Sequence, residues 1–332
     1  MIRGWKSLAV VGALVVGGVI ATAGTSQAAN PALSRHQRTV AFWTKQRVAQ
    51  AVPRDFTYHS GKGTLAPTAR PGTGSELKGA SWINGGEVLK NTGKVLFAMG
   101  GSYYVCSASV VDDSVSGRSI ILTAAHCVYD EVAKAFATNW VFIPEYDTKP
   151  VKLDSAGSFC AQTMYGCWTE SATVVASGYA NAGGFNDVAI VHDYAFVVVE
   201  GGGFNGTTQL DSVVGSHPIT FSSVSLGSTM HLFGYPAAQK YKGNDLVYSK
   251  GALGTDPNAA DLTYKVTSNM TGGSSGGPWF SSFDESTGTG VLSSVNSYGY
   301  SGVTAMHGPK LNSETEAMFG LAGTMSVDTI YG

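Results

Sequence analysis

Leu-Thr-Ala-Ala-His-Cys at residues 122–127 and Gly-Ser-Ser-Gly-Gly-Pro at residues 273–278 are the two stretches that decide how this sequence folds and acts. Between them, His-Asp-Tyr-Ala-Phe at residues 192–196 contributes an aspartate. A histidine, an aspartate and a serine in this order are the side chains that a Ser-His-Asp acyl-transfer site requires. The sequence therefore predicts an enzyme of that chemistry.

Ser275 is the predicted nucleophile and His126 is the predicted base. A serine hydroxyl is a weak nucleophile at neutral pH, so it needs a base within hydrogen-bond reach. Imidazole suits that role because it takes up and releases protons near neutral pH. The glycines around Ser275 let the backbone N–H groups of Gly273 and Ser275 converge on one point, which would form an oxyanion hole.

Two aspartates compete for the acidic position. Asp-Val-Ala begins at Asp187 and Asp-Tyr-Ala begins at Asp193, and apolar residues follow both. We prefer Asp193, because the strand-like run after it extends to Val199 before Gly201 ends it. Asp187 remains the alternative.

The composition favours an all-β protein without nucleic-acid or cofactor partners. Of the 332 residues, 43% are hydrophobic, only 13% are charged and 43 are glycines. Short runs of Val, Thr, Ser and Tyr are broken by turn residues, a pattern typical of many short strands. The net charge of −2 comes without a cluster of Lys and Arg, so no nucleic-acid partner is expected. The sequence has no nucleotide-binding loop or haem-attachment motif, and we expect no cofactor.

Residues 1–28 are typical of a secretory signal peptide. Arg3 and Lys6 give a positive start, residues 8–20 form an apolar core, and residues 26–28 have the small-x-small pattern of a cleavage site. A signal anchor is the alternative, but the apolar run is short for a membrane span of ~20 residues. We therefore expect a secreted monomer that has no membrane attachment once the signal is removed.

The rest of the chain divides into an N-terminal extension and one β-rich domain. Residues 29–80 are predicted to be a propeptide or extension, with a helix after Ser34 and a linker rich in Gly, Pro, Thr and Ser at residues 60–79. A helix that simply packs on the domain is the alternative. The strand-like runs that follow predict two successive β-barrels and a short C-terminal helix. The expected bounds are 81–332 for the domain, about 86–200 for the first barrel, about 216–332 for the second, 219–224 for one strand of the second barrel and 314–323 for the helix.

These motifs resemble those of the chymotrypsin-like serine peptidases, in particular the secreted bacterial trypsin-like and V8-like branch. The resemblance covers roughly the last three quarters of the chain. It is carried by Thr-Ala-Ala-His-Cys at 123–127, Asp-Tyr-Ala at 193–195, Gly-Tyr-Pro at 234–236, Gly-x-Ser-Gly-Gly-Pro at 273–278 and Ser-Tyr-Gly at 297–299. It implies a chymotrypsin-like double β-barrel and a serine endopeptidase. Such an enzyme would cleave protein or peptide substrates through His126, Asp193, Ser275 and an acyl-enzyme intermediate.

The four cysteines of an exported chain predict two disulfides, with three possible pairings. The resemblance implies that Cys106 pairs with Cys127, which leaves Cys160 and Cys167 to close a tight loop. A zinc site is the competing interpretation. We expect no metal, because no histidine stands at ligand spacing beside these cysteines.

The resemblance also implies where substrate binds. Ser297, Tyr298 and Gly299 match the strand that pairs with a bound peptide by main-chain hydrogen bonds. Asn269 stands where trypsin-type enzymes carry the aspartate that selects Lys or Arg, and Asn296 stands where glutamate-specific relatives place a histidine. Neither familiar charged specificity is therefore predicted.

Ser274 is a second departure, because animal members of the family carry an aspartate at this position. That aspartate pairs with a new N-terminal ammonium when those enzymes are activated. A serine has no charge to offset the burial of an ammonium. We therefore expect the turn around Ser275 to be held by its own packing.

Two other functions remain as alternatives. The chain could be a catalytically inactive, peptidase-like binding module. It could also be an α/β-hydrolase esterase, because Gly273-x-Ser275-x-Gly277 fits a nucleophile elbow, with Asp284 and His307 as the later acid and base.

Overall fold

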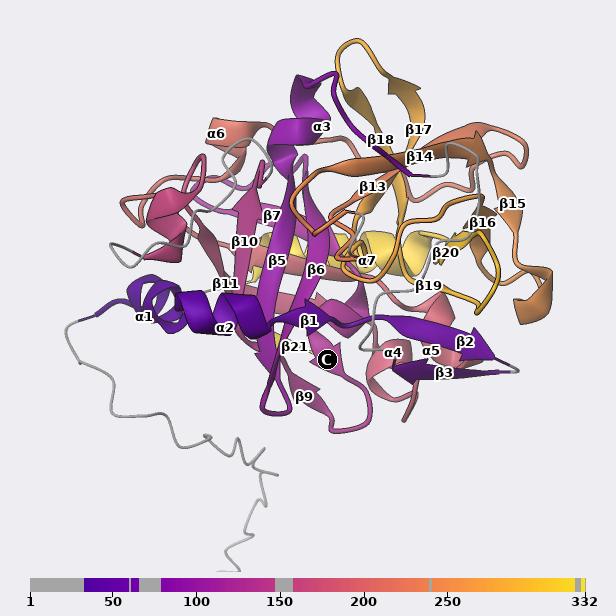
Figure 1. Cartoon of the computed structure of the whole chain (residues 1–332), viewed down its shortest axis with the longest axis horizontal. Helices are drawn as coiled ribbons and strands as arrows, with labels where there is room; N and C mark the ends of the chain where they lie inside the picture. The colour runs from indigo at the N-terminus through magenta and orange to yellow at the C-terminus, as the bar shows by residue number, and fades with distance from the viewer. Residues whose placement is uncertain are drawn as a thin grey trace, which may run out of the picture. The chain divides into compact units, whose positions relative to one another are not determined.

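The computed structural model describes residues 33–59, 61–65, 79–146, 158–238, 241–325 and 330–331 (Figure 1). The predicted signal peptide at 1–28 and most of the predicted linker at 60–79 lie outside these residues. Within the described part of the chain, no helix is long and apolar enough to cross a membrane.

Six strands of the first half close into a barrel. They are β5 (Thr92–Met99), β6 (Ser102–Val111), β7 (Ser119–Thr123), β10 (Thr138–Pro144), β11 (Trp168–Val175) and β12 (Ala195–Val199). The strand order is β6-β5-β10-β11-β12-β7, and β7 pairs back with β6. Every residue of β5, β7, β11 and β12 is buried, as expected for strands covered on both faces.

The second half forms two further sheets together with β4, β2 and β3, which precede the first barrel in the chain. The first has the order β18-β17-β13-β14-β4, from β18 (Thr289–Val295), β17 (Pro278–Asp284), β13 (Thr229–Gly234), β14 (Val247–Ala252) and β4 (Ala80–Ser81). The other has the order β15-β16-β20-β19-β2-β3, from β15 (Gly254–Thr255), β16 (Tyr264–Val266), β20 (Met306–Gly308), β19 (Tyr298–Gly299), β2 (Phe56–His59) and β3 (Lys62–Leu65). The strand expected at 219–224 was wrong, since Ile219 makes only an isolated bridge to Leu292.

The remaining elements are short. They are β1 (Val52–Pro53), β8 (Tyr129–Asp130), β9 (Ala135–Phe136), β21 (Ile330–Tyr331), α3 (Gly86–Asn91), α4 (Ser177–Ala180), α5 (Asp187–Val191), α6 (Asp211–Val214), and the 3-10 turns η1 (Ala125–Cys127), η2 (Phe159–Gln162) and η3 (Pro257–Ala259).

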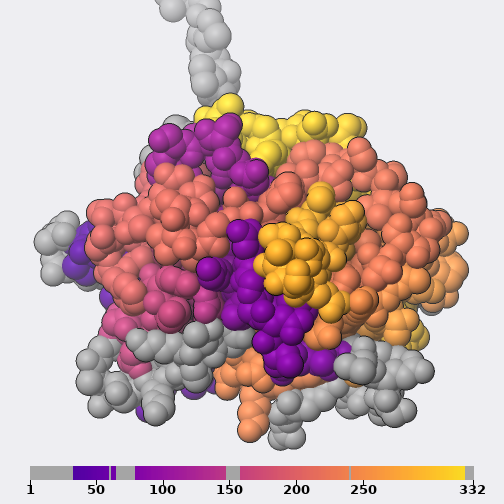
Figure 2. All heavy atoms as spheres, turned by 90° about the horizontal axis from the view of Figure 1, so that it is seen from above, coloured from indigo at the N-terminus to yellow at the C-terminus, as the bar shows by residue number. Residues whose placement is uncertain are grey.

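The two halves are joined at the face shown in Figure 2, where α3 (purple) lies beside the turn between β17 and β18 (orange to yellow). The backbone N–H groups of Glu87 and Val88 donate to the carbonyls of Thr287 and Gly288. The C-terminal helix α7 (Ser313–Thr324), which was expected at 314–323, packs on β11 and β12 of the first barrel.

The N-terminal helix region packs on the first barrel. Ser34 caps α1 (Arg35–Phe42) in a capping box with Gln37, as the sequence indicated. The helix ends at Trp43, and a separate helix, α2 (Lys45–Gln50), follows. Trp43 is buried, and its indole N–H donates to the carbonyl of Asn139. This buried tryptophan fixes the extension to the barrel.

The predicted all-β class with a C-terminal helix is confirmed by these elements. The α/β-hydrolase alternative is wrong, because the residues after Ser275 enter β17 where a nucleophile elbow requires a helix.

Candidate active site

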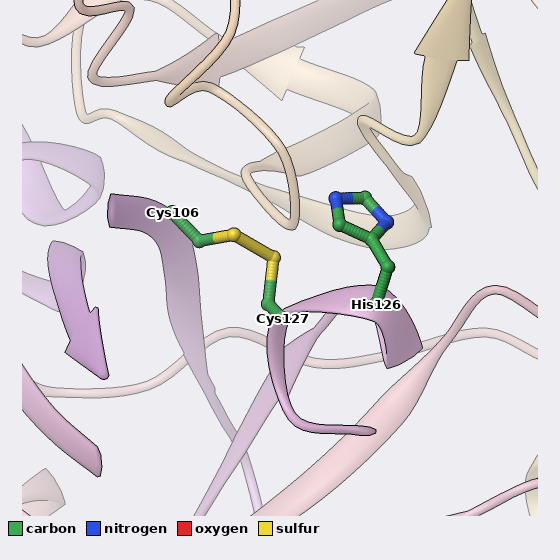
Figure 3. Close-up of side chains that lie close together, drawn as sticks. All are labelled: Cys106, His126 and Cys127. Carbon is green, nitrogen blue, oxygen red and sulfur yellow. A yellow bond between two sulfur atoms is a disulfide. The ribbon is translucent and has the colours of Figure 1, made fainter. Parts of the chain in front are cut away.

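His126 lies in η1, immediately after β7. The disulfide between Cys106 and Cys127 joins η1 to β6, and the imidazole projects from the same turn (Figure 3). The backbone of the turn is held further by the Cys127 N–H, which donates to the Ala124 carbonyl at 3.0 Å. The predicted base is thus anchored covalently to the neighbouring strand.

Asp193 precedes β12, which runs antiparallel to β7 with Ala195 opposite Thr123. This register brings Asp193 to the strand end that carries His126. One carboxylate oxygen of Asp193 lies 2.7 Å from Nδ1 of His126, and the other accepts the His126 backbone N–H at 2.9 Å. The Ser297 hydroxyl donates to the first of these oxygens at 2.5 Å. Three donors therefore fix the buried carboxylate against the imidazole.

Asp187, the alternative acid, lies elsewhere. It is the first residue of α5, and its carboxylate accepts a hydrogen bond from the Tyr58 hydroxyl. The contact to His126 comes from Asp193. The pattern around Asp187 therefore belongs to a helix, whereas Asp193 leads into a strand.

Ser275 lies in a turn that requires its glycines. Gly273 and Gly276 have φ values of +95° and +79°, in the region that glycine adopts readily. A Cβ on Gly276 would lie 2.1 Å from Oγ1 of Thr123, so this turn packs directly on the end of β7. Any side chain at Gly276 would push the nucleophile turn away from the strand that leads to His126.

Ser107 on β6 holds the nucleophile turn from the first barrel. Its hydroxyl donates to the Gly273 carbonyl at 2.8 Å, and its backbone N–H donates to the Ser275 carbonyl at 2.7 Å. The same hydroxyl accepts the backbone N–H of Tyr235 at 2.9 Å. One buried serine thus fixes both sides of Ser274.

Asn296 and Ser274 hold the turn from the second half. The Asn296 amide donates to the carbonyls of Ser274 and Phe233 at 2.9 and 2.8 Å, and its oxygen accepts the Trp279 indole N–H at 2.7 Å. The Ser274 hydroxyl donates to the Thr271 carbonyl at 2.8 Å. Ser274 stands where animal members of the family have an aspartate, and its hydroxyl therefore finds its hydrogen-bond partner within the turn.

Three polar groups at the site lack a partner within the described residues. They are the N–H groups of Gly273 and Ser275 and the buried Nε2 of His126. No hydrogen bond joins the side chains of Ser275 and His126 in the described part of the chain. With Nδ1 of His126 donating to Asp193, Nε2 is left as an acceptor. Within the described residues, the site therefore has two N–H donors and one ring-nitrogen acceptor that the protein itself does not use.

The expected substrate-binding residues are partly engaged by the protein itself. Tyr298 and Gly299 form β19, which pairs with β20 on one side and with β2 on the other. The Ser297 hydroxyl binds Asp193, so this side chain positions the acid. Asn269 accepts the Tyr241 hydroxyl at 2.6 Å.

The sequence did not predict that Ser107 and Asn296 position the turn around Ser275. Ser107 follows Cys106 in a strand rich in small residues, and nothing in that pattern distinguishes it from Ser109. Asn296 was read only as a departure in specificity. The proximity of both to the turn depends on strand pairing between distant segments.

Cys106, His126 and Cys127 gather their ligand-type atoms within 4.8 Å. Both sulfurs are used in the disulfide, so neither is a thiolate that could bind zinc. The second disulfide joins Cys160 to Cys167, so both predicted pairs are confirmed.

No family model matches the chain, and no curated protein sequence matches it. Among solved structures, protease Anisep from Arthrobacter nicotinovorans is 34% identical, with a TM-score of 0.58 over 71% of this chain and 96% of that one. The thermostable serine protease AL20 from an extremophilic microorganism is 32% identical, with a TM-score of 0.59 over 72% of this chain and 100% of that one. A Glu endopeptidase is 18% identical, with a TM-score of 0.55 over 75% of this chain and 98% of that one, and shares the fold.

The fold is therefore that of the double-barrel serine proteases. The chain belongs to the chymotrypsin-like serine protease family.

Proposed function

We propose that the protein is a secreted serine endopeptidase that hydrolyses peptide bonds through Ser275, His126 and Asp193. The observation that carries this proposal is the pair His126–Asp193, with 2.7 Å between Nδ1 and the carboxylate, beside an Nε2 that has no partner among the described residues. Family membership supports the peptidase class.

The proposed reaction follows from the roles of these atoms. Nε2 of His126 takes the proton of Ser275 as Oγ attacks the substrate carbonyl carbon. The oxyanion accepts the N–H groups of Gly273 and Ser275. His126 then gives its proton to the leaving amine, and an acyl-enzyme remains on Ser275. A water molecule then attacks the acyl-enzyme with His126 again as the base, and the carboxylic acid product leaves Ser275. Asp193 keeps Nδ1 of His126 protonated throughout.

We further propose that the protein is exported and acts as a monomer on protein or peptide substrates. Two disulfides support an oxidising compartment. The signal-like pattern of residues 1–28 supports the same conclusion.

The proposed specificity is for uncharged side chains at the position before the cleaved bond. Asn269 and Gly299, the proposed base and wall of the pocket, carry no charge to pair with Lys, Arg or Glu. Burial of an unpaired charge is costly. A peptide library should show the best cleavage after uncharged residues, and a hundredfold preference for any charged residue would contradict the pocket assignment.

The function is tested by Ser275→Ala and His126→Ala in the exported protein, assayed on a quenched-fluorescence peptide library. Each change is expected to lower hydrolysis by about four orders of magnitude or more, the size known for related triads, with an unchanged far-UV circular dichroism spectrum. If neither the parent nor a chain that carries Phe56→Ser and Tyr58→Ser hydrolyses any peptide, while both chains bind peptides, the alternative of an inactive binding module is correct.

A further inference from the structure

Residues 52–59, here called the cleft segment, pass from the first barrel to the second across the candidate site. Its first part, β1, pairs with β6, with Val52 opposite Tyr104. Its last part, β2, pairs with β19, with Phe56 opposite Tyr298 and Thr57 opposite Gly299. In Figure 1, α1, α2, β1 and β2 follow one another along this course. The cleft segment therefore occupies the strand edge that was assigned to substrate.

The centre of the cleft segment contacts the proposed base. The Arg54 guanidinium donates to the His126 carbonyl at 2.7 Å, and the Phe56 ring lies edge-on to the imidazole, with 5.4 Å between ring centroids. Phe56 also stacks on Phe185 at 4.0 Å. Arg54 is buried and lies 3.7 Å from a carboxylate oxygen of Glu131. The imidazole is thus covered by an anchored segment.

The segment also fits closely against the nucleophile turn. A Cβ built on Gly272 would lie 2.8 Å from Cβ of Pro53 and 2.9 Å from Cβ of Asp55. Gly272 directly precedes Gly273, one of the two proposed oxyanion donors. The segment therefore packs directly beside the turn that carries Ser275.

Tyr58 fills a second aromatic site. Its ring is fully buried and lies 5.2 Å from Tyr298 and 5.9 Å from Tyr300, centroid to centroid. Its hydroxyl donates to the Asp187 carboxylate. Phe56 and Tyr58 point to the same face of β2, because alternate residues of a strand share a face. Two aromatic anchors, two residues apart, hold the segment.

The segment is bound without being placed for cleavage. In the described part of the chain, neither Gly273 nor Ser275 donates its N–H to a carbonyl. A substrate must place its scissile carbonyl oxygen against these two donors. The segment covers His126 and the strand edge while leaving the oxyanion donors unused.

We propose that the cleft segment is a built-in inhibitor of the peptidase, held by Phe56 and Tyr58 in two aromatic subsites. This inference rests on the proposed function and names what blocks the site in the full chain. The same subsites would receive extended peptides that carry aromatic side chains two residues apart.

The test replaces both anchors in the full chain with Phe56→Ser and Tyr58→Ser. A matched control is His59→Ser, because His59 is the exposed residue at the end of the same strand. Binding of a free peptide at the place of the cleft segment is measured without catalysis, in chains that also carry Ser275→Ala. The probe is a fluorescein-labelled peptide with the sequence of residues 52–59, and binding is followed by anisotropy. A second peptide with serine at both aromatic positions reports non-specific binding.

The labelled peptide should bind the double variant at least tenfold more tightly than it binds the parent or the His59→Ser control. With Ser275 present, a fluorophosphonate should label the double variant at least tenfold faster than the parent, and the free peptide should slow that labelling. Equal peptide binding by parent and double variant, or binding by neither, would overturn the inference. Peptide binding without any labelling would support the occupancy of the cleft and count against the proposed function alone.

Discussion

The two sides of the candidate site are held by different means. On the first-barrel side, His126 and Asp193 extend from adjacent strands of a closed barrel, and a disulfide fixes the turn of the base. On the other side, Ser275 lies in an irregular glycine turn that depends on side-chain hydrogen bonds from Ser107 and Asn296. Regular sheet and a covalent bond thus position the proposed acid and base, whereas single polar side chains position the proposed nucleophile.

Both halves pair with a strand from the N-terminal part of the chain, since β1 adds to β6 of the barrel and β2 adds to β19. β7 pairs back with β6 in the first barrel. β19 instead pairs with β20 on one side and with β2 on the other. An unpaired strand edge is a ready template for an extended peptide. The edge of β19 that pairs with β2 could therefore pair with an extended substrate or with an inhibitor.

The largest effect should separate the two candidate acids. Asp193→Asn is expected to lower kcat/KM by about 10⁴-fold, because the imidazole would lose the acceptor that fixes its tautomer. Asp187→Asn, whose carboxylate lies on α5, should not lower the rate. Both are measured on a peptide substrate in a chain that carries Phe56→Ser and Tyr58→Ser. The opposite ranking would move the acid to Asp187.

The next prediction tests the hydrogen bonds by which Ser107 of the first barrel positions the turn around Ser275. Ser107→Ala removes the hydroxyl that binds the Gly273 carbonyl and the Tyr235 N–H, and we expect a fall in kcat of about tenfold or more with a smaller change in KM. Ser109→Ala is the matched control, since this buried hydroxyl on the same strand has no partner among the described residues. Equal kcat values for the two variants would show that Ser107 does not position the turn.

The next prediction compares the two disulfides, of which only Cys106–Cys127 lies beside the candidate site. The pairs Cys106–Cys127 and Cys160–Cys167 have sequence separations of 21 and 7. Replacement by alanine should lower the free energy of unfolding by about 3 and about 2 kcal/mol respectively, from loop entropy. Only the first pair should also lower kcat, because it fixes η1. Denaturant unfolding and steady-state kinetics measure both quantities, and an equal loss of kcat in the two variants would contradict this account.

The last of these predictions concerns His217, in the connection between the halves. Its backbone pairs with Val110 and Asp112, its ring packs against Phe280, and burial lowers the pKa of His217 from 6.5 to about 4. Its stabilising contribution is therefore complete above pH 6.5 and is lost as the pH falls toward 4, because only the unfolded chain then binds the proton. Between pH 7 and 4 the parent should lose up to about 3 kcal/mol more stability than His217→Phe. Parallel stability profiles would contradict this expectation.

The sequence predicted the proposed catalytic residues better than it predicted the residues that position them. Glycines around Ser275 and the cysteine beside His126 have fixed spacing along the chain, and most strand bounds follow from β-branched runs. The contacts of Ser107 and Asn296 depend on pairings between segments far apart in the sequence. A lone serine or asparagine has no local pattern that reveals such a partner.

The cleft segment shows the same limit. The sequence predicted a helix after Ser34 and a linker, but Phe56 and Tyr58 lie between them in a run too short to indicate a strand. Their burial comes from segments that are distant in the sequence, because they pack against β19 and Phe185. Local propensity could not show this, because the partner strand is more than two hundred residues away.

The central claim is that Ser275 is a nucleophile activated by His126. The most direct test is labelling of the Phe56→Ser and Tyr58→Ser chain with a fluorophosphonate, followed by mass-spectrometric mapping of the modified residue. The account predicts one adduct, on Ser275, which His126→Ala abolishes and prior heat unfolding prevents. An adduct on another residue, or labelling of Ser275 that is unchanged in His126→Ala, would contradict it.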